Sequence, residues 1–260
     1  MSHTPLSGLN ALVCGSSQGI GRACAVEFAR LGARVTLLAR NAEALESVRA
    51  SLPGAGHAVA VADFADPESV RSAAAQGLAG MGTFHILLNN TGGPPGGPIV
   101  DATPDDFLRA FRAHLINNHL LVQSVVPGMK HAGYGRILNV ISTSVKQPIP
   151  GLGVSNTIRG AVASWAKTLS GELGPFGITV NNLLPGFTRT QRLFSLLEDR
   201  ARKAGRPVED LEGAWVAEIP AGRLGEPEEL AAVAGFLASP AAAYVNGVSL
   251  PVDGGRTSAL

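Results

Sequence analysis

The sequence is poor in the residues that would place it in several common classes of protein. It has only two cysteines, Cys14 and Cys24, and neither a C-x-x-C motif nor a histidine cluster, so we expect buried thiols and no metal site. No apolar run reaches the length of roughly 18 residues that a membrane span requires, and Met1–Asn10 has no apolar signal region. We therefore expect a cytoplasmic protein without a membrane partner.

The chain also lacks an excess of charge of either sign. Its 21 Lys and Arg nearly balance its 20 Asp and Glu, so no general electrostatic field favours nucleic acid as a partner. Hydrophobic residues make up 45% of the chain, which is enough to bury a large core. No linker-like stretch divides the chain, so we expect a single domain, 1–260, whose partner is a small molecule.

Short β-rich apolar runs alternate with longer segments of helical period, which is typical of βαβ units that build a parallel sheet. The predicted strands are Ala11–Cys14, Arg34–Ala39, His57–Ala62, Ile86–Asn89, Arg136–Ile141, Thr179–Leu184 and Val248–Val252. The predicted helices are Ile20–Leu31, Ala42–Leu52, Pro67–Ala79, Pro104–His131, Val154–Leu173 and Pro227–Ala238. This pattern predicts an α/β fold, a doubly wound seven-stranded parallel sheet of the Rossmann type with helices on both faces. Ligands of such sheets bind at the carboxyl ends of the strands.

The segment Phe187–Pro220 interrupts this alternation. It is rich in Arg, Glu and Leu, and its pattern predicts one or two amphipathic helices inserted in a loop. We expect a substrate lid at 187–220, the alternative being a surface helical hairpin with no role in closure.

A glycine-rich turn of the form G-x-x-x-G-x-G follows the first strand and opens a helix. Glycines permit the tight turn and let the backbone approach a pyrophosphate, whose charge is met by free N–H groups at the helix N-terminus. The turn therefore indicates a dinucleotide site, and its predicted contacts are Gly15, Ser16, Ser17, Gly19, Ile20 and Gly21.

Further motifs follow at ordered intervals, namely Asp63-Phe64, Asn89-Asn90-Thr91-Gly92, Pro185-Gly186 followed by Thr190, Arg223-Leu224-Gly225-Glu226-Pro227 and Val252-Asp253-Gly254-Gly255. With the glycine turn they resemble the short-chain dehydrogenase/reductase family over nearly the full length, and in particular its 3-oxoacyl-carrier-protein reductases. The resemblance implies an Asp beside the adenine ring, a loop after the fourth strand and a loop over the nicotinamide. The cofactor residues that it adds are Asp63, Phe64, Asn89, Thr91, Gly92, Arg159, Pro185, Gly186, Thr188 and Thr190.

The choice of cofactor depends on the end of the second predicted strand. An acidic residue there would hydrogen-bond the ribose 2′-hydroxyl and repel a 2′-phosphate, but this chain has Ala39-Arg40. A guanidinium can form a charge-assisted bidentate pair with a phosphate, so NADP(H) is favoured over NAD(H). If Arg40 only stacks on the adenine or points to water, NAD(H) stays possible.

The resemblance also implies a catalytic set, and this chain departs from it. Ser142 corresponds to the serine that orients the carbonyl. Where the family has Tyr-x-x-x-Lys, the chain has Ser155-Asn156-Thr157-Ile158-Arg159. The only two tyrosines, Tyr134 and Tyr244, do not begin a helix after Ser142, and no lysine completes the motif. The family asparagine falls on His114, although one helical turn of slip would select Asn117 or Asn118.

This substitution changes the proton chemistry. A serine hydroxyl is a far weaker acid than a phenol of pKa about 10, and an arginine of pKa above 12 does not relay protons. Arg159 can still bind the nicotinamide ribose or polarise a carbonyl, and Ser142 can still bind an oxyanion. A proton would come from His114 or from water. Alternatively, His114 is a histidine whose hydrogen bonds are satisfied in the core or at a subunit interface. Lys146 is a further candidate for the proton donor.

These features predict an NADP(H)-dependent oxidoreductase for a carbonyl or alcohol substrate, similar to 3-oxoacyl-carrier-protein reductases but with a non-standard proton relay. One alternative is a non-redox lyase or isomerase that uses Ser142, Ser155 and Arg159. Another is a dinucleotide-binding protein without turnover. The helices Pro104–His131 and Val154–Leu173 resemble the family pair that packs against a two-fold partner, so we expect a homotetramer or homodimer.

Overall fold

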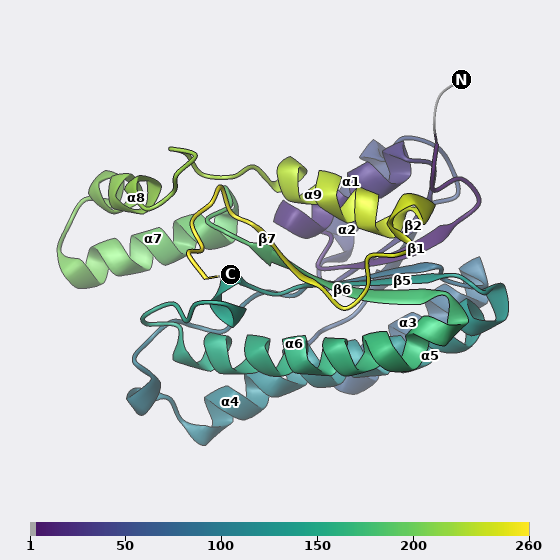
Figure 1. The fold of residues 1–260 in the computed structure, drawn as a ribbon, viewed down its shortest axis with the longest axis horizontal. Helices are drawn as coiled ribbons and strands as arrows, with labels where there is room; N and C mark the ends of the chain where they lie inside the picture. The colour runs from purple at the N-terminus through teal and green to yellow at the C-terminus, as the bar shows by residue number, and fades with distance from the viewer. Residues whose placement is uncertain (1–3, 260) are drawn as a thin grey trace.

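The fold is built around one parallel β-sheet (Figure 1). The computed structural model describes residues 4–259. Its strands are β1 (Asn10–Cys14), β2 (Arg34–Ala39), β3 (Ala58–Val61), β4 (Ile86–Asn89), β5 (Gly135–Val140), β6 (Ile178–Pro185) and β7 (Ser249–Val252). They pair in parallel in the order β3-β2-β1-β4-β5-β6-β7. The predicted seven-stranded doubly wound sheet is therefore confirmed.

Helices cover both faces of this sheet. They are α1 (Gly19–Arg30), α2 (Ala42–Ser51), α3 (Pro67–Met81), α4 (Pro104–Phe111), α5 (Asn117–Ala132), α6 (Gly153–Leu173), α7 (Gln191–Ala204), α8 (Val208–Ala217) and α9 (Pro227–Ala238). Figure 1 shows α1, α2 and α9 on one side of the sheet and α3, α5 and α6 on the other. This three-layer arrangement buries both faces of every central strand, as parallel sheets require.

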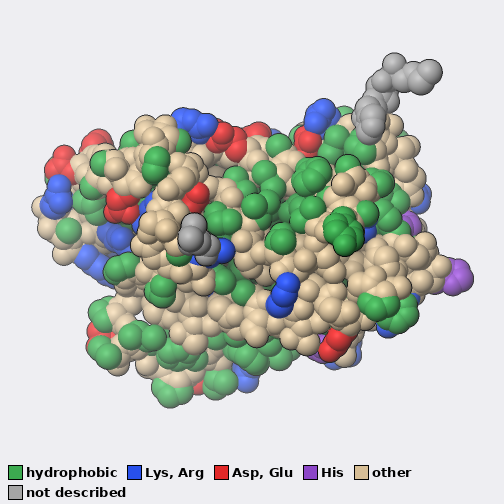
Figure 2. Space-filling model, in the orientation of Figure 1, with side chains coloured by type: hydrophobic (Ala, Val, Ile, Leu, Met, Phe, Trp, Pro, Cys, Tyr) green, Lys and Arg blue, Asp and Glu red, His purple; other side chains and the backbone are tan. Residues whose placement is uncertain are grey.

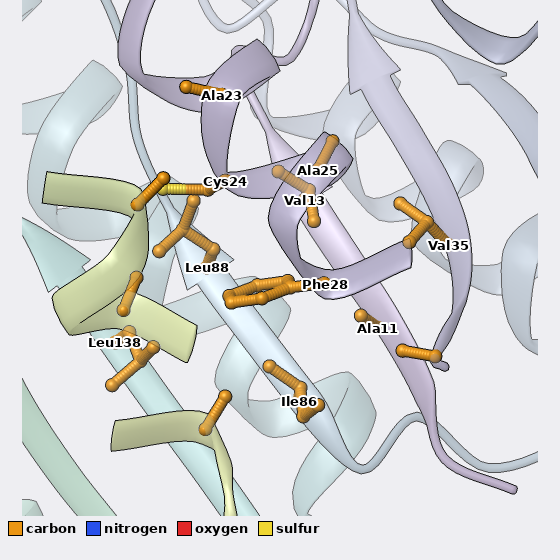
Figure 3. Close-up of a cluster of buried hydrophobic side chains, with 14 of the residues drawn as sticks. Ala11, Val13, Ala23, Cys24, Ala25, Phe28, Val35, Ile86, Leu88 and Leu138 are labelled. Atoms are coloured by element: carbon orange, nitrogen blue, oxygen red, sulfur yellow. The ribbon is translucent and has the colours of Figure 1, made fainter. Parts of the chain in front are cut away.

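The two largest apolar clusters of the core lie on opposite faces of the sheet. Successive strand residues point to opposite faces, so Ala11 and Val13 of β1 join the cluster beneath α1 and α9, while Leu12 and Cys14 join the other. Figure 3 shows Phe28 of α1 among the side chains of the first cluster. Cys14 and the other cysteine are buried and unpaired, as predicted, and burial raises their thiol pKa values so that the thiols stay protonated.

Most helix starts are explained by capping. The side chains of Asn41, Asp66 and Thr103 accept backbone N–H groups at the first turns of α2, α3 and α4, and a proline follows the cap in the last two. Helix α1 differs, because its N-cap Gln18 makes no side-chain cap and its first turn holds no acidic residue. The N–H groups that begin α1 are therefore left for another partner.

Most predicted elements differ from the observed ones by one or two residues at an end, and two of the differences have a clear structural cause. The strand predicted over His57–Ala62 is only Ala58–Val61, because the His57 ring, rather than a backbone carbonyl, accepts the N–H of Val35. The helix predicted over Pro104–His131 is interrupted by a π-helical turn at Arg112–Ile116 between α4 and α5. Such turns insert one extra residue per hydrogen-bonded ring and are frequent at functional sites.

The predicted insertion at 187–220 contains α7 and α8. They pack around an apolar cluster of their own that includes Leu193, Leu197 and Trp215, and Phe187 stacks on Trp215 with ring centroids 4.5 Å apart. Figure 1 shows this pair of helices at one end of the molecule, beyond the sheet. The predicted amphipathic helices are therefore present, and their function as a lid stays a prediction.

Candidate active site

A cavity of about 370 Å³ lies where the strand order of the sheet reverses, at the carboxyl ends of β1 and β4. The chain after β1 proceeds to β2 on one side, whereas β4 is on the other side, so the loops after β1 and β4 diverge and leave a crevice. The predicted site residues that line the cavity are Gly15, Ser17, Gly19, Ile20, Thr91, Gly92, Ser142, Ser155, Arg159, Pro185, Gly186, Thr188 and Thr190. Five separate loops and helices thus contribute to one site.

The glycine turn can form only with glycine at its two ends. A Cβ atom on Gly21 would lie 2.2 Å from the carbonyl oxygen of Gly15, and one on Gly15 would lie 2.6 Å from the carbonyl oxygen of Asn90. Asn90 also donates from Nδ2 to the carbonyl oxygens of Cys14 and Gly15, each at 3.3 Å. The turn after β1 is therefore held against the loop after β4, and its backbone faces the cavity.

The residues of this turn fit the pyrophosphate of a dinucleotide. The first N–H groups of α1 have no side-chain cap, and the buried hydroxyl of Ser16 has no hydrogen-bond partner among residues 4–259. Thr190 closes the other side, since a Cβ on Gly19 would meet its Cγ2 at 3.4 Å. Free N–H groups at a helix start and a backbone without side chains are what an anionic phosphate needs.

Three of the predicted catalytic residues meet in the cavity. Ser142 follows β5, while Ser155 and Arg159 lie one turn apart on α6. The hydroxyl oxygen of Ser142 accepts the N–H of Ser144 at 3.1 Å, which leaves the hydroxyl proton of Ser142 available to a ligand. The sheet thus places one serine opposite a helix that presents a second serine and a cation.

Arg159 is a buried cation whose charge is not balanced by a nearby carboxylate of the described residues. Its side chain is only 8% exposed, and its Nη1 donates to the carbonyl oxygen of Val140 at 3.0 Å. No carboxylate lies within ion-pair distance of Arg159 among residues 4–259. Burial, and then the positive charge of Arg192, lower the pKa of Arg159 to about 10. The guanidinium is therefore still protonated at neutral pH.

His114 lies on the π-helical turn, behind the cavity wall. It is 2% exposed, does not line the cavity, and its Nδ1 lies 2.5 Å from Oγ1 of Thr91, which does. Burial, followed by the charges of Arg159 and Arg192, lowers the pKa of His114 to about 2. The imidazole is neutral near pH 7, so this geometry favours positioning of Thr91 over direct proton donation. Asn117, the alternative to His114, donates instead to the carbonyl oxygen of Phe64.

The side chain of Asn89 lies inside the sheet and does not line the cavity. Asn89 is 2% exposed and donates to Oδ1 of Asn139 at 2.9 Å, and Asn139 donates in turn to Asn182 at 3.0 Å. These residues are in register on β4, β5 and β6, so their amides connect the strands inside the sheet. The neighbouring Asn90 lines the cavity in its place.

The remaining predicted cofactor residues lie at the same edge of the sheet, outside the cavity. Arg40 follows β2 and is exposed, and Asp63 and Phe64 follow β3, its neighbour in the sheet. The Asp63 carboxylate accepts the N–H of Ala65 at 2.9 Å. These three residues lie on the side of the glycine turn away from Ser142 and Ser155, beside the strands to which an extended dinucleotide would reach.

Several cavity residues were missed by the sequence reasoning. Arg192 and Leu196 come from α7, Arg256 comes from the segment after β7, and Leu152 precedes α6. Arg192 stands two positions after the predicted Thr190, so its position in the chain was a usable signal. Arg256 offered no such signal, because its place in the cavity depends on how the C-terminal segment returns to the sheet.

Neither a tyrosine nor a lysine lines the cavity in the described part of the chain. The hydroxyl of Tyr134 donates to the carbonyl oxygen of Ala238 at 2.7 Å, Tyr244 is fully exposed, and Lys146 lies in the loop after Ser142 without reaching the cavity. Within residues 4–259 no group of His, Cys, Asp and Glu is arranged to hold a metal ion. Of the described helices, none has both the length and the apolar character that crossing a membrane requires.

A family model described as enoyl-(acyl carrier protein) reductase matches residues 15–257 of the chain, a range that includes the glycine turn, Ser142, Arg159 and the C-terminal motifs. Gluconate 5-dehydrogenase of Gluconobacter oxydans is 34% identical over 100% of both chains. The chain belongs to the short-chain dehydrogenase/reductase family. The predicted family and the enzyme class are therefore confirmed.

Other members of the family are about as similar to this chain as the gluconate 5-dehydrogenase is. This short-chain dehydrogenase/reductase is 35% identical to a 3-oxoacyl-[acyl-carrier-protein] reductase of Pseudomonas aeruginosa, over 96% of this chain and 98% of that protein. The solved structure of L-sorbose reductase from Gluconobacter frateurii, complexed with NADPH and L-sorbose, superposes with a TM-score of 0.93 and 30% identity, covering 99% of this chain and 100% of that one. The fold of this family member therefore agrees with an experimental structure of the family.

Proposed function

We propose that this protein is an NADP(H)-dependent oxidoreductase that interconverts a carbonyl compound and its alcohol, with Ser155 and Arg159 in place of the family tyrosine and lysine. The supporting observation is that Ser142, Ser155 and Arg159 line the same cavity as the glycine turn. A carbonyl held by these groups would lie beside the nicotinamide end of a dinucleotide that begins at the turn.

The preference for NADP(H) is supported by Arg40. It is exposed at the carboxyl end of β2, where the sequence has no carboxylate to repel a 2′-phosphate. The turn after β1 is adjacent, since the N–H of Gly15 donates to the carbonyl oxygen of Leu38 at 2.7 Å. The related L-sorbose reductase, whose structure contains NADPH, provides independent support.

Ser142 and Arg159 are the groups that would stabilise the substrate oxygen. The hydroxyl proton of Ser142 is free to donate, because its oxygen already accepts the N–H of Ser144. Arg159 uses one of its five N–H donors on Val140, which fixes the guanidinium and leaves other donors for a ribose hydroxyl or a developing oxyanion. NADPH, when bound, supplies the hydride to the carbonyl carbon.

The proton that completes the alcohol comes from water in this proposal. Neither serine is acidic enough to donate freely at neutral pH, and the His114 imidazole is neutral and behind the wall. Ser155 lines the cavity and is only half-buried, so its hydroxyl can hold such a water. The reaction would therefore proceed without a side chain that changes its charge.

The segment 187–220 would act as the lid of this site. Two arginines of α7 reach across to loops on the other side of the cavity: Arg192 donates to the carbonyl oxygen of Pro94 at 2.7 Å, and Arg200 to that of Pro150 at 3.0 Å. The Gly-Pro loop after β4 also forms a wall, where Gly96 lies between Leu152 and Leu196. Closure of α7 over the cavity would exclude bulk water from the reacting carbonyl.

The proposal is tested by calorimetric titration with NADP(H) and NAD(H), followed by a panel of carbonyl compounds and alcohols monitored by NADPH absorbance. Tight NADPH binding with turnover of a panel member is the expected result. Binding without turnover in either direction would leave a dinucleotide-binding protein, and conversion without any dinucleotide would leave a lyase or isomerase.

A matched pair of glycine variants controls this experiment. Gly21→Ala places a methyl group 2.2 Å from a backbone oxygen and should abolish dinucleotide binding, whereas Gly80→Ala on α3 meets no atom within 4 Å. The second variant should bind as the wild type does. Thermal unfolding of both variants shows whether lost binding is only lost folding.

A further inference from the structure

The cavity has a marked imbalance of charge. Three arginines line it, Arg159 from α6, Arg192 from α7 and Arg256 from the C-terminal segment, and no Asp or Glu of the described residues does. Arg256 is compensated, because it pairs with Glu218 at 2.6 Å and stacks over the Phe187 ring at 4.1 Å. Arg159 and Arg192 have no ion-pair partner within residues 4–259.

Arg192 is held at the mouth of the cavity. It is exposed, and its Nη2 donates to the carbonyl oxygen of Pro94 in the loop after β4. A Cβ atom on Gly93 would lie 3.6 Å from the same Nη2, so the guanidinium rests against that loop. One of its five N–H donors is used, and the others are available to a ligand.

The two uncompensated guanidiniums influence each other. The charge of Arg192 lowers the pKa of both Arg159 and His114, so it acts on the catalytic end of the cavity. Like charges around a partly closed cavity repel each other more strongly than they would in water. An anion between them would remove this repulsion, and a neutral ligand would not.

Two anions could fill this place, the pyrophosphate of the cofactor and a carboxylate of the substrate. The uncapped start of α1, between Gly15 and Gly21, already provides the donors that a pyrophosphate needs. Arg192 instead contacts Gly93 and Pro94, beside the leucines at 152 and 196 that flank the Gly-Pro loop. Arg192 is thus held against the loop after β4, whereas Thr190, the N-cap of the same helix, lies against Gly19 of the glycine turn.

We propose that the substrate is an oxo acid, or the corresponding hydroxy acid, whose carboxylate pairs with Arg192 while its carbonyl oxygen faces Ser142 and Arg159. This inference rests on the proposed oxidoreductase function. In reduction the hydride adds to the carbonyl carbon, the carbonyl π pair moves to oxygen, and water supplies the proton to that oxygen. The carboxylate of the substrate is unchanged by the reaction. The carbon chain of the substrate lies against Leu152 and Leu196.

The test uses matched pairs of 2-oxo and 3-oxo acids with their methyl esters, assayed with NADPH. The wild-type protein should prefer each acid in kcat/KM. Arg192→Gln should reduce kcat/KM for the acid by about 10- to 100-fold more than for the ester, mainly through KM, and Arg192→Lys should recover part of the loss. Arg202→Gln is the control, because Arg202 lies on the same helix but pairs with Asp199 on the surface.

A second measurement does not depend on turnover. Calorimetry on the NADPH complex should show binding of a hydroxy acid that is weakened about tenfold or more by Arg192→Gln, with the Kd of NADPH unchanged. Equal turnover of acid and ester would overturn the inference and leave the oxidoreductase proposal intact. Binding of the acid without turnover would support the anion site and overturn the oxidoreductase proposal. If Arg192→Gln weakens NADPH and acid together, Arg192 binds the pyrophosphate and the inference is wrong.

Discussion

Arg40 lies directly after β2, next to the glycine turn, and it has no ion-pair partner among the described residues. Arg40→Ala should weaken NADPH binding by about 1–3 kcal/mol, the range for a lost charge-assisted contact, and leave NADH nearly unchanged. Calorimetry with both cofactors measures this difference. Arg71→Ala, at an exposed ion pair on α3, is the control, and equal losses for both cofactors would argue against a 2′-phosphate contact.

Arg159 should matter more for turnover than Ser155. A preorganised charged donor at an oxyanion contributes on the order of 10²–10³ in rate, whereas a water can replace the neutral hydroxyl of Ser155. We expect a loss of this size for Arg159→Met, a smaller loss for Ser155→Ala, and partial recovery in Arg159→Lys. If Arg159→Met keeps turnover and cofactor affinity but lowers Tm, the arginine has only a structural role.

His114 should make the protein less stable in mild acid. Its pKa is lowered to about 2 in the folded state, so below the unfolded value near 6.5 only the unfolded chain gains a proton. The free energy of unfolding therefore falls with falling pH, by up to about 1.4 kcal/mol per pH unit from this residue.

The pH experiment compares urea unfolding at pH 6 and pH 5. His114→Gln should lose about 1 kcal/mol less than the wild type over this interval, because the glutamine does not titrate. His131→Gln, at the exposed end of α5, should keep the wild-type dependence. The same slope in the wild type and His114→Gln would show that His114 is protonated in the folded state.

At the scale of secondary structure, two arginines of α7, Arg192 and Arg200, bind backbone carbonyls of loops outside the 187–220 segment. Arg200 donates to Pro150 and lies over the Trp215 ring at 5.2 Å, so it connects α7, α8 and the loop before α6. Such contacts leave the sheet and core unchanged when they break. This is the arrangement expected of an element that opens and closes.

Arg200→Met should loosen this lid without unfolding the protein. We expect KM to rise roughly 5- to 10-fold, equivalent to about 1 kcal/mol for one lost hydrogen bond, and faster proteolysis within 187–220. Substrate with NADPH should slow the cleavage. Arg206→Met, which removes only an exposed pair with Asp210, is the control, and identical cleavage in both variants would contradict the lid.

At the scale of the whole molecule, apolar side chains are left uncovered near α4. Val100 is 88% exposed, Leu108 is 50% exposed and Phe111 is 37% exposed. Figure 2 shows charges of both signs interspersed over the visible face, so no single-sign field opposes association. Leu108 and Phe111 lie on the first helix of the predicted pair, and we predict that this pair packs against a second copy.

Light scattering at micromolar concentration tests this association. The wild type should have the mass of a dimer or tetramer, and the double variant Leu108→Glu, Phe111→Glu should have a smaller mass. Val61→Glu changes a similarly exposed residue on β3 and should leave the mass unchanged. A monomeric wild type would refute the prediction.

Local patterns in the sequence were enough for most of the fold and for the cofactor end of the site. Arg34–Ala39, Ile86–Asn89 and Pro227–Ala238 were predicted with their observed bounds, because each combines an apolar run with a clear local stop or a capping proline. The glycine turn was predicted for the same reason, since the need for glycine is set by atoms within and beside the turn.

Only the tertiary structure decides which charged side chains reach the site and which of them form ion pairs. The sequence has many arginines, and only the folded chain pairs Arg256 with Glu218 while leaving Arg159 and Arg192 without a carboxylate partner among residues 4–259. It also brings Thr91 from another loop within 2.5 Å of the His114 ring. Helix and strand propensity and helix capping depend on a few neighbouring residues, so they can be predicted from the sequence alone. Burial and Coulomb energy depend on distances in space, which this sequence defines only once its sheet has formed.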